Sequence, residues 1–178
     1  MPLYSTEYGY KTDPPLPGAV AIATAALYMN WAEWISWRDP RIRSYDQYLL
    51  TDPPAGAGEF VTGLEFADGT PKPSFDAYRM PLFLPATSGS AGRQLEVWGC
   101  VRPARFARIA TGQRQVVEIQ LEAAGTRSFR TVRAVQLNDP YGYFDVFQRF
   151  ESSGSVRLRW SYPGGETIFS RTVEITIR

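Results

Sequence analysis

The sequence predicts two structural classes in one chain, a mixed α/β first half and an antiparallel β-sandwich in the second half. Residues 19–38 contain no glycine or proline and are rich in alanine and aromatic residues, which is typical of a long helix. Strand-like runs flank this segment on both sides. Beyond residue 94, apolar and polar residues alternate with a period of two in six successive runs, which indicates strands with one buried face.

The first half alternates strand-like and helix-like segments, an order that favours parallel strands joined by crossover helices. The long helix is expected to end before Asp39-Pro40, because a residue that precedes proline disfavours helical geometry. Two strands and two helices cannot close a sheet or cover both its faces, so this half is interpreted as part of a domain. The expected elements are a strand at Leu3–Tyr8, a helix at Ala19–Arg38, a strand at Ile42–Leu50 and a short helix that begins near Ser74.

The second half is expected to form a separate domain behind a linker. Residues 86–93 are Ala-Thr-Ser-Gly-Ser-Ala-Gly-Arg, a linker composition, so we predict domains at residues 1–85 and 94–178. Six or seven short strands at this spacing are typical of a sandwich, and Trp98 and Trp160 are expected in its core. The predicted strands are Gln94–Val101, Gln115–Leu121, Ser128–Leu137, Tyr143–Phe150, Ser155–Tyr162 and Thr172–Ile177.

The composition excludes several classes of function. The chain has no histidine and a net charge of +1, which excludes Ser-His-Asp and Cys-His catalysis and removes the commonest zinc ligand. No spacing typical of a metal, phosphate or nucleic-acid site occurs, so we expect no cofactor, no metal and no nucleic-acid partner. The single cysteine, Cys100, lies in a strand-like run and is expected to be a buried thiol.

Membrane and secretion signals are also missing from the sequence. No apolar run reaches the roughly 18 residues that a membrane helix needs, so we expect no membrane partner. Residues 1–5 have neither the basic nor the apolar region of a signal peptide. Residues 91–178 carry 13 arginines and eight acidic residues, which favours either an anionic partner or simply a solvated sandwich surface.

Glu7 is the candidate catalytic residue of the first half. It lies near the end of the predicted strand Leu3–Tyr8, and aromatic residues surround it. Catalytic groups of (β/α)8 barrels sit at the C-terminal ends of strands, where a carboxylate is placed to act on a substrate. The alternative is a strand-end glutamate that caps a loop or pairs with an arginine. The local pattern leaves both interpretations open.

An ordered set of motifs covers nearly all of residues 6–82. They are Thr6-Glu7-Tyr8-Gly9-Tyr10-Lys11-Thr12, Ala26-Leu27-Tyr28, Asp39-Pro40-Arg41-Ile42-Arg43-Ser44, Gln47–Asp52, Thr62–Phe66 and Asp68–Leu82. This set resembles the end of bacterial (β/α)8-barrel glycoside hydrolases, especially actinobacterial cellulase-like proteins. The tracts Val97–Pro103 and Tyr141–Phe144 resemble the sandwich that often follows in them. The resemblance implies the C-terminal portion of a (β/α)8 barrel, strands seven and eight, followed by an antiparallel Ig-like β-sandwich.

The resemblance also implies roles for individual residues. Glu7 would be the nucleophile of a retaining mechanism, which needs a second carboxyl group about 5–5.5 Å away. That acid/base lies on a part of the barrel that this chain lacks, so we expect no hydrolysis by the chain alone. Tyr8 and Tyr10 would stack on sugar or orient the nucleophile, or else serve in packing. Tyr48 and Asp52 would border the substrate site.

The implied partners are a carbohydrate substrate and a surface that completes the barrel. That surface would be the missing N-terminal barrel portion or a second copy bound through residues 1–85. The full-length enzyme would be extracellular or attached to the cell surface. A second hypothesis is a non-catalytic module, in which the sandwich binds carbohydrate or packs as an accessory domain.

Trp31, Trp34 and Trp37 recur every third residue and share one side of the predicted helix. We interpret them as a face that packs against neighbouring elements, and a carbohydrate platform is the alternative. The resembling family often has a tryptophan near its last strand, and this sequence has none between Arg38 and Trp98. That departure puts sugar stacking at this strand in doubt.

Overall fold

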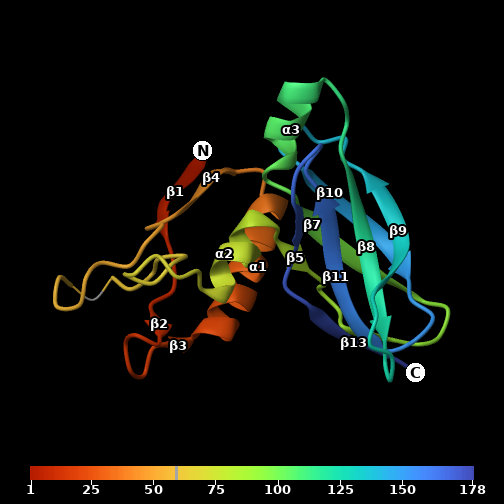
Figure 1. Cartoon of the computed structure of the whole chain (residues 1–178), viewed down its shortest axis with the longest axis horizontal. Coiled ribbons are helices and arrows are strands. Elements are labelled where there is room, and N and C mark those ends of the chain that lie inside the picture. The colour runs from red at the N-terminus through yellow and green to blue at the C-terminus, as the bar shows by residue number, and fades with distance from the viewer. Residues whose placement is uncertain (59) are drawn as a thin grey trace. The chain divides into compact units, whose positions relative to one another are not determined.

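The computed structural model describes residues 1–58 and 60–178 (Figure 1). The chain divides by its internal contacts into two compact units, Met1–Tyr78 and Arg79–Arg178. These residues form thirteen strands and three helices, so the chain is mostly β. None of the three helices is both long and apolar enough to cross a bilayer.

The first unit contains two small parallel sheets and two helices. Strand β1 (Leu3–Tyr8) pairs in parallel with β4 (Ile42–Gln47), and the helix α1 (Ile22–Arg38) connects them in sequence. Two further short strands, β2 (Thr12–Asp13) and β3 (Val20–Ala21), pair in parallel ahead of α1. Figure 1 shows the long α1 beside the shorter α2 (Pro73–Arg79).

Helix α1 ends as its sequence predicts and buries a face that the sequence did not indicate. Its last residue is Arg38, and Asp39 is already extended before Pro40. The buried residues of α1 are Ala25, Ala26, Met29, Asn30 and Glu33, which recur at helical spacing. Asn30 Nδ2 donates to the carbonyl oxygen of Ala77 at 2.8 Å, which ties α1 to α2. The expected packing face of tryptophans is not observed, because Trp31 and Trp37 are 47% and 42% exposed.

The predicted (β/α)8-barrel portion is wrong. Strands β1 and β4 do pair in parallel, the arrangement that the β-α-β order predicts. Within the described parts of the chain, however, they pair only with each other. A barrel strand is covered on both faces, whereas no residue of β1 is buried. The local β-α-β order is therefore present without a barrel wall around it.

The second unit is a β-sandwich of two sheets. One sheet has the order β10-β7-β5 and the other has the order β6-β13-β11-β8-β9, with β12 paired to β11. All neighbouring strands are antiparallel except β13 and β6. The first sheet contains β5 (Leu82–Phe83), β7 (Gln94–Cys100) and β10 (Tyr143–Arg149). The second contains β6 (Ser88–Gly89), β8 (Val116–Ala123), β9 (Arg130–Gln136), β11 (Gly154–Ser161), β12 (Thr167–Phe169) and β13 (Val173–Ile177).

One hydrophobic core lies between these two sheets, and residues of both contribute to it. Alternation selects which side chains enter the core: Val156, Leu158 and Trp160 of β11 are buried, while Arg157 and Arg159 point outward. The expected burial of Trp98, Trp160 and Cys100 is confirmed. A third helix, α3 (Ala104–Thr111), connects the two sheets between β7 and β8.

The division between the units comes earlier in the chain than the predicted linker. Contacts place it between Tyr78 and Arg79, and β5 already pairs with β7 of the sandwich. Residues 86–93 contain β6, which pairs in parallel with β13. The backbone N–H groups of Thr176 and Arg178 donate to the carbonyl oxygens of Thr87 and Gly89 at 2.9 and 3.0 Å.

Candidate functional site

Residues 48–72 of the first unit form a long loop that folds back on itself. Isolated β-bridges join Thr51 to Glu65 and Glu65 to Pro71. Gln47 Nε2 donates to the carbonyl oxygen of Thr62 at 2.7 Å, and the Thr62 hydroxyl donates to the carbonyl oxygen of Tyr48 at 2.8 Å. These two bonds connect the start of the loop to its later part and so hold the described residues of this irregular segment in place.

A buried ion pair holds the centre of this loop. Lys72 Nζ lies 2.7 Å from Asp52 Oδ2, and the two side chains are 0% and 1% exposed. The same ammonium group donates to the hydroxyl of Thr12 at 2.9 Å, and it lies 3.4 Å from the carbonyl oxygen of Val61. Through this one charged group, Lys72 at the end of the loop contacts Thr12 of β2 and two other parts of the loop, at Asp52 and at Val61.

Gly63 allows Asp52 to complete this arrangement. Its backbone N–H donates to Asp52 Oδ1 at 2.8 Å, so both carboxylate oxygens of Asp52 are engaged within the loop. A Cβ atom at position 63 would lie 2.5 Å from the backbone nitrogen of Asp52. Only glycine permits this approach of the two chain segments.

A cavity of about 540 Å³ opens beside the ion pair. Its described lining is mainly apolar and includes two carboxylates, those of Asp52 and Asp68. Lys72 Nζ lies 5.2 Å from the ring centroid of Phe66, which fixes the position of that aromatic side chain. The apolar part of the lining consists of Pro15, Leu16, Pro53, Pro54, Val61 and Phe66.

Asp68 is the solvent-exposed carboxylate of this cavity. The backbone N–H of Thr70 donates to its Oδ1 at 2.9 Å, and this bond lowers the pKa of Asp68 below its usual value. One carboxylate oxygen is thus committed to the Asp68-Gly69 turn. The carboxylate is ionised in neutral solution and can accept a hydrogen bond from a ligand.

The structure places the predicted catalytic residue away from this cavity. Glu7 is exposed on β1 and is not part of the described cavity lining. Tyr8 and Tyr10 meet edge to face, with ring centroids 5.3 Å apart and their hydroxyls hydrogen-bonded. Tyr8 also packs on Tyr45 at 4.5 Å, and burial followed by the bond to Tyr10 raises the pKa of Tyr8. The predicted roles of Glu7, Tyr8 and Tyr10 stay predictions.

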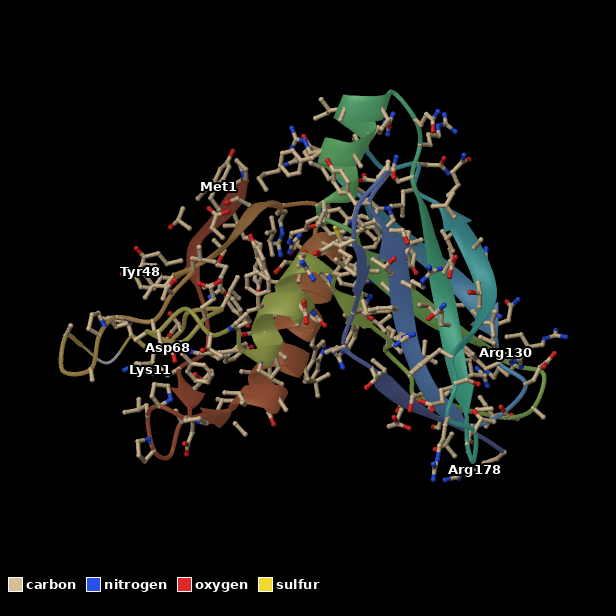
Figure 2. The ribbon with its side chains drawn as sticks, in the orientation of Figure 1. Met1, Lys11, Tyr48, Asp68, Arg130 and Arg178 are labelled. Carbon is tan, nitrogen blue, oxygen red and sulfur yellow. The ribbon has the colours of Figure 1, made fainter. Side chains whose placement is uncertain are left out.

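The other two predicted binding residues lie in the long loop. Asp52 lines the cavity, whereas Tyr48 packs edge to face on Phe60, with centroids 6.0 Å apart. Phe60 is 59% exposed, and Lys11 Nζ lies 5.5 Å from its ring centroid. Figure 2 shows Tyr48, Lys11 and Asp68 on the loops of the first unit. The structure thus groups Tyr48 with an aromatic partner that the sequence did not single out.

The sequence analysis did not select the cavity residues Phe66 and Asp68, nor Lys72, the ion-pair partner of Asp52. The only local signal was the turn dipeptide Asp68-Gly69. Lys72 stands between two prolines, and nothing in that context predicts a buried partner twenty residues earlier. In residues 1–58 and 60–178, no cluster of three or more histidine, cysteine, aspartate or glutamate side chains is placed to hold a metal ion.

Comparison with protein-family models gives no match, and comparison with curated proteins gives none either. Several solved structures are similar. A superoxide reductase (neelaredoxin) from Ignicoccus hospitalis is 12% identical, over 56% of this chain and 80% of its own, with a TM-score of 0.43. The sulfur carrier protein SoxY from Chlorobium limicola is 9% identical, over 56% and 79%, with a TM-score of 0.39.

A third similar structure is a calcium-binding mutant of β-glucuronidase 2 from Bacteroides uniformis. It is 16% identical and covers 99% of this chain and 22% of its own, with a TM-score of 0.39. The interpretation of this chain as part of a cellulase-like barrel hydrolase is wrong, because the described strands form no barrel. What the chain has is a β-sandwich and a smaller unit with a cavity.

Proposed function

We propose that this chain is a non-catalytic carbohydrate-binding protein, in which the cavity of the first unit takes a sugar residue. The cavity beside the Asp52–Lys72 pair carries this proposal. Small-molecule sites are commonly clefts of about 300–1,000 Å³ with a mainly apolar lining and a few fixed polar groups. A volume of about 540 Å³ with two carboxylates fits that description.

The chemistry of the lining suits a sugar. A sugar ring has apolar C–H faces, which pack on aromatic and proline rings, and hydroxyls at its edge, which donate to carboxylates. Phe66 and the three prolines supply the apolar contact, and the exposed carboxylate of Asp68 supplies an acceptor. Asp52 is held by Lys72 and Gly63, so this wall of the cavity is already ordered before a ligand binds.

An exposed aromatic residue nearby in the sequence, Phe60, supports the same function. Phe60 precedes the cavity residue Val61, and its ring packs against Tyr48. The exposed ring of Phe60 offers an apolar surface to a further sugar unit of an oligosaccharide. This proposal retains two of the residues predicted from the sequence, Tyr48 beside Phe60 and Asp52 in the wall of the cavity.

Isothermal titration of the full chain with cellotetraose, xylotetraose and mannotetraose tests the proposal. We expect at least one of them to bind, and Phe66→Ala and Asp68→Asn to weaken that binding by about tenfold each, or about 1.4 kcal/mol. Phe147→Ala and Asp46→Asn are matched controls, because both residues are exposed and lie outside the described cavity lining. Absence of binding to all three sugars, or equal loss in the controls, overturns the proposal.

A further inference from the structure

Helix α3 of the second unit buries its small side chains and exposes its large apolar ones, the reverse of an ordinary amphipathic helix. Its inward residues are small: Ala104 and Ala107 are 3% and 0% exposed and belong to the sandwich core. Its large apolar residues face water, with Phe106 65% exposed and Ile109 71% exposed. A helix that only served the fold would bury its large apolar side chains and expose its small ones.

The two exposed side chains are held as a pair. Phe106 and Ile109 are three residues apart, so they are neighbours on the helix surface. Gly112 ends the helix in the left-handed conformation, with φ of 69°, and its N–H donates to the carbonyl oxygen of Arg108 at 2.8 Å. Figure 1 shows α3 as a short helix at one end of the second unit's strands. A fixed helix therefore presents both side chains.

The surroundings of this pair are basic. Arginines stand at positions 102, 105, 108 and 114, and no acidic residue occurs between Val97 and Val117. Arg105 is exposed and its guanidinium lies 4.7 Å from the ring centroid of Tyr141. The carboxylate of Asp139 accepts the N–H groups of Tyr141 and Tyr143 at 2.8 and 3.4 Å, so it is occupied by its own turn.

The cavity described beside α3 is too small to accept a side chain of a protein partner. The cavity beside the helix, lined in part by Arg105, Arg108 and Asp139, has a volume of only about 10 Å³. A convex apolar pair needs either a matching pocket on its partner or a medium that deforms around it. The interface of a lipid bilayer deforms in this way, and anionic headgroups attract arginines that flank the inserted residues.

We propose that α3 attaches the chain to an anionic lipid surface, with Phe106 and Ile109 entering the interface and Arg105, Arg108 and Arg114 facing the phosphates. This is peripheral attachment, which needs no helix that crosses the bilayer. It uses the second unit alone and does not depend on the proposed sugar-binding cavity. Two apolar anchors with a basic surround give reversible binding that weakens with salt.

Flotation of the full chain with vesicles tests the proposal. One set of vesicles is phosphatidylcholine, and in the other set part of it is replaced by phosphatidylglycerol. We expect the chain to float with the anionic vesicles at about tenfold lower lipid concentration than with the neutral ones. High salt should reduce this difference, and soluble glycerol phosphate at millimolar concentration should not displace the chain. Displacement by glycerol phosphate would show a phosphate site instead of a lipid surface.

Variants assign the binding to α3. Phe106→Ser/Ile109→Ser should weaken binding to anionic vesicles by about tenfold or more, and Arg105→Gln/Arg114→Gln should remove the preference for anionic lipid. Phe147→Ser is the matched control, since Phe147 is 57% exposed on β10. Circular dichroism checks that each variant is folded. If the Phe106/Ile109 variant floats as the unsubstituted chain does, or if the chain ignores anionic vesicles, the inference is wrong.

Discussion

Asp52 and Lys72, twenty residues apart in the sequence, form an ion pair of 2.7 Å that is excluded from solvent. The Lys72 ammonium group also donates to the hydroxyl of Thr12, and the N–H of Gly63 donates to the Asp52 carboxylate. Buried charges are tolerated when each is paired and hydrogen-bonded, and either charge alone is strongly unfavourable. The shape of the cavity in the first unit therefore depends on both residues together.

Replacing Lys72 with methionine should destabilise the first unit by about 3–5 kcal/mol, because it leaves the Asp52 carboxylate buried without its partner. Urea denaturation followed by tryptophan fluorescence measures this, since Trp31, Trp34 and Trp37 lie in α1. Lys11→Met is the control and should cost under about 1 kcal/mol, the usual scale of a cation–π contact. The double variant Asp52→Asn/Lys72→Met should be more stable than Lys72→Met; the reverse order would contradict the ion-pair explanation.

Sugar binding should depend on pH through Asp68. The N–H of Thr70 lowers the pKa of Asp68 below the ordinary aspartate value of about 3.9. The carboxylate therefore stays ionised to a lower pH than an ordinary aspartate does. The stabilising effect of this bond is full above the unfolded pKa and is lost as the pH falls through the lowered folded pKa. We expect constant affinity from neutral pH down to about pH 5 and a loss only below about pH 4. Titration calorimetry with Asp68→Asn as the comparison should show a weaker affinity without that acidic loss.

The full chain should self-associate through α1. Trp31 and Ile35 are 47% and 51% exposed and lie four residues apart, so they are neighbours on one side of this helix. Exposed apolar patches on soluble proteins commonly mark association surfaces. Sedimentation velocity should show association that increases with concentration. Trp31→Ser/Ile35→Ser should shift the chain toward the monomer, whereas Leu50→Ser, at a residue 60% exposed in the same unit, should leave association unchanged. Monomer at all concentrations would contradict this prediction.

Gly142→Ala should destabilise the sandwich by about 3 kcal/mol or more. Gly142 has φ of 91°, and a Cβ atom there would lie 2.3 Å from the carbonyl oxygen of Val101. Gly164 also has a positive φ, of 70°, but has no atom within 4 Å of its added Cβ. Gly164→Ala should therefore cost only about 1–2 kcal/mol, the backbone contribution alone. Thermal unfolding of the two variants separates the clash from the backbone strain.

The sandwich strands could be predicted because a strand with one buried face alternates apolar and polar residues in the sequence. Each of the six predicted runs overlaps one strand from β7 to β13, and the shifts at their ends are small. The two- and three-residue strands β2, β3, β5, β6 and β12 were missed, because so few residues show no alternation. Helix α3 was missed as well, although Pro103 before it and Gly112 after it are recognisable boundaries.

The barrel and the cavity show where local patterns stop being informative. The order of segments predicts that β1 and β4 are parallel, and they are, but nothing local says how many further strands join them. The cavity depends on contacts between residues far apart in sequence, such as Lys72 with Thr12. Asp52 was predicted as a site residue from the family resemblance, and its partners became visible only in three dimensions.

The pairing of β6 with β13 affects how the second unit should be isolated. By composition, residues 86–93 are the natural place to cut, yet Ser88 and Gly89 pair with Thr176 and Ile177. A shortened chain that starts at residue 94 would leave β13 as an uncovered edge strand with free backbone donors and acceptors. Such an edge is a template for intermolecular β-pairing, and preparations of that fragment would aggregate. Starting the fragment at Arg79 retains both β5 and β6 and keeps this edge protected.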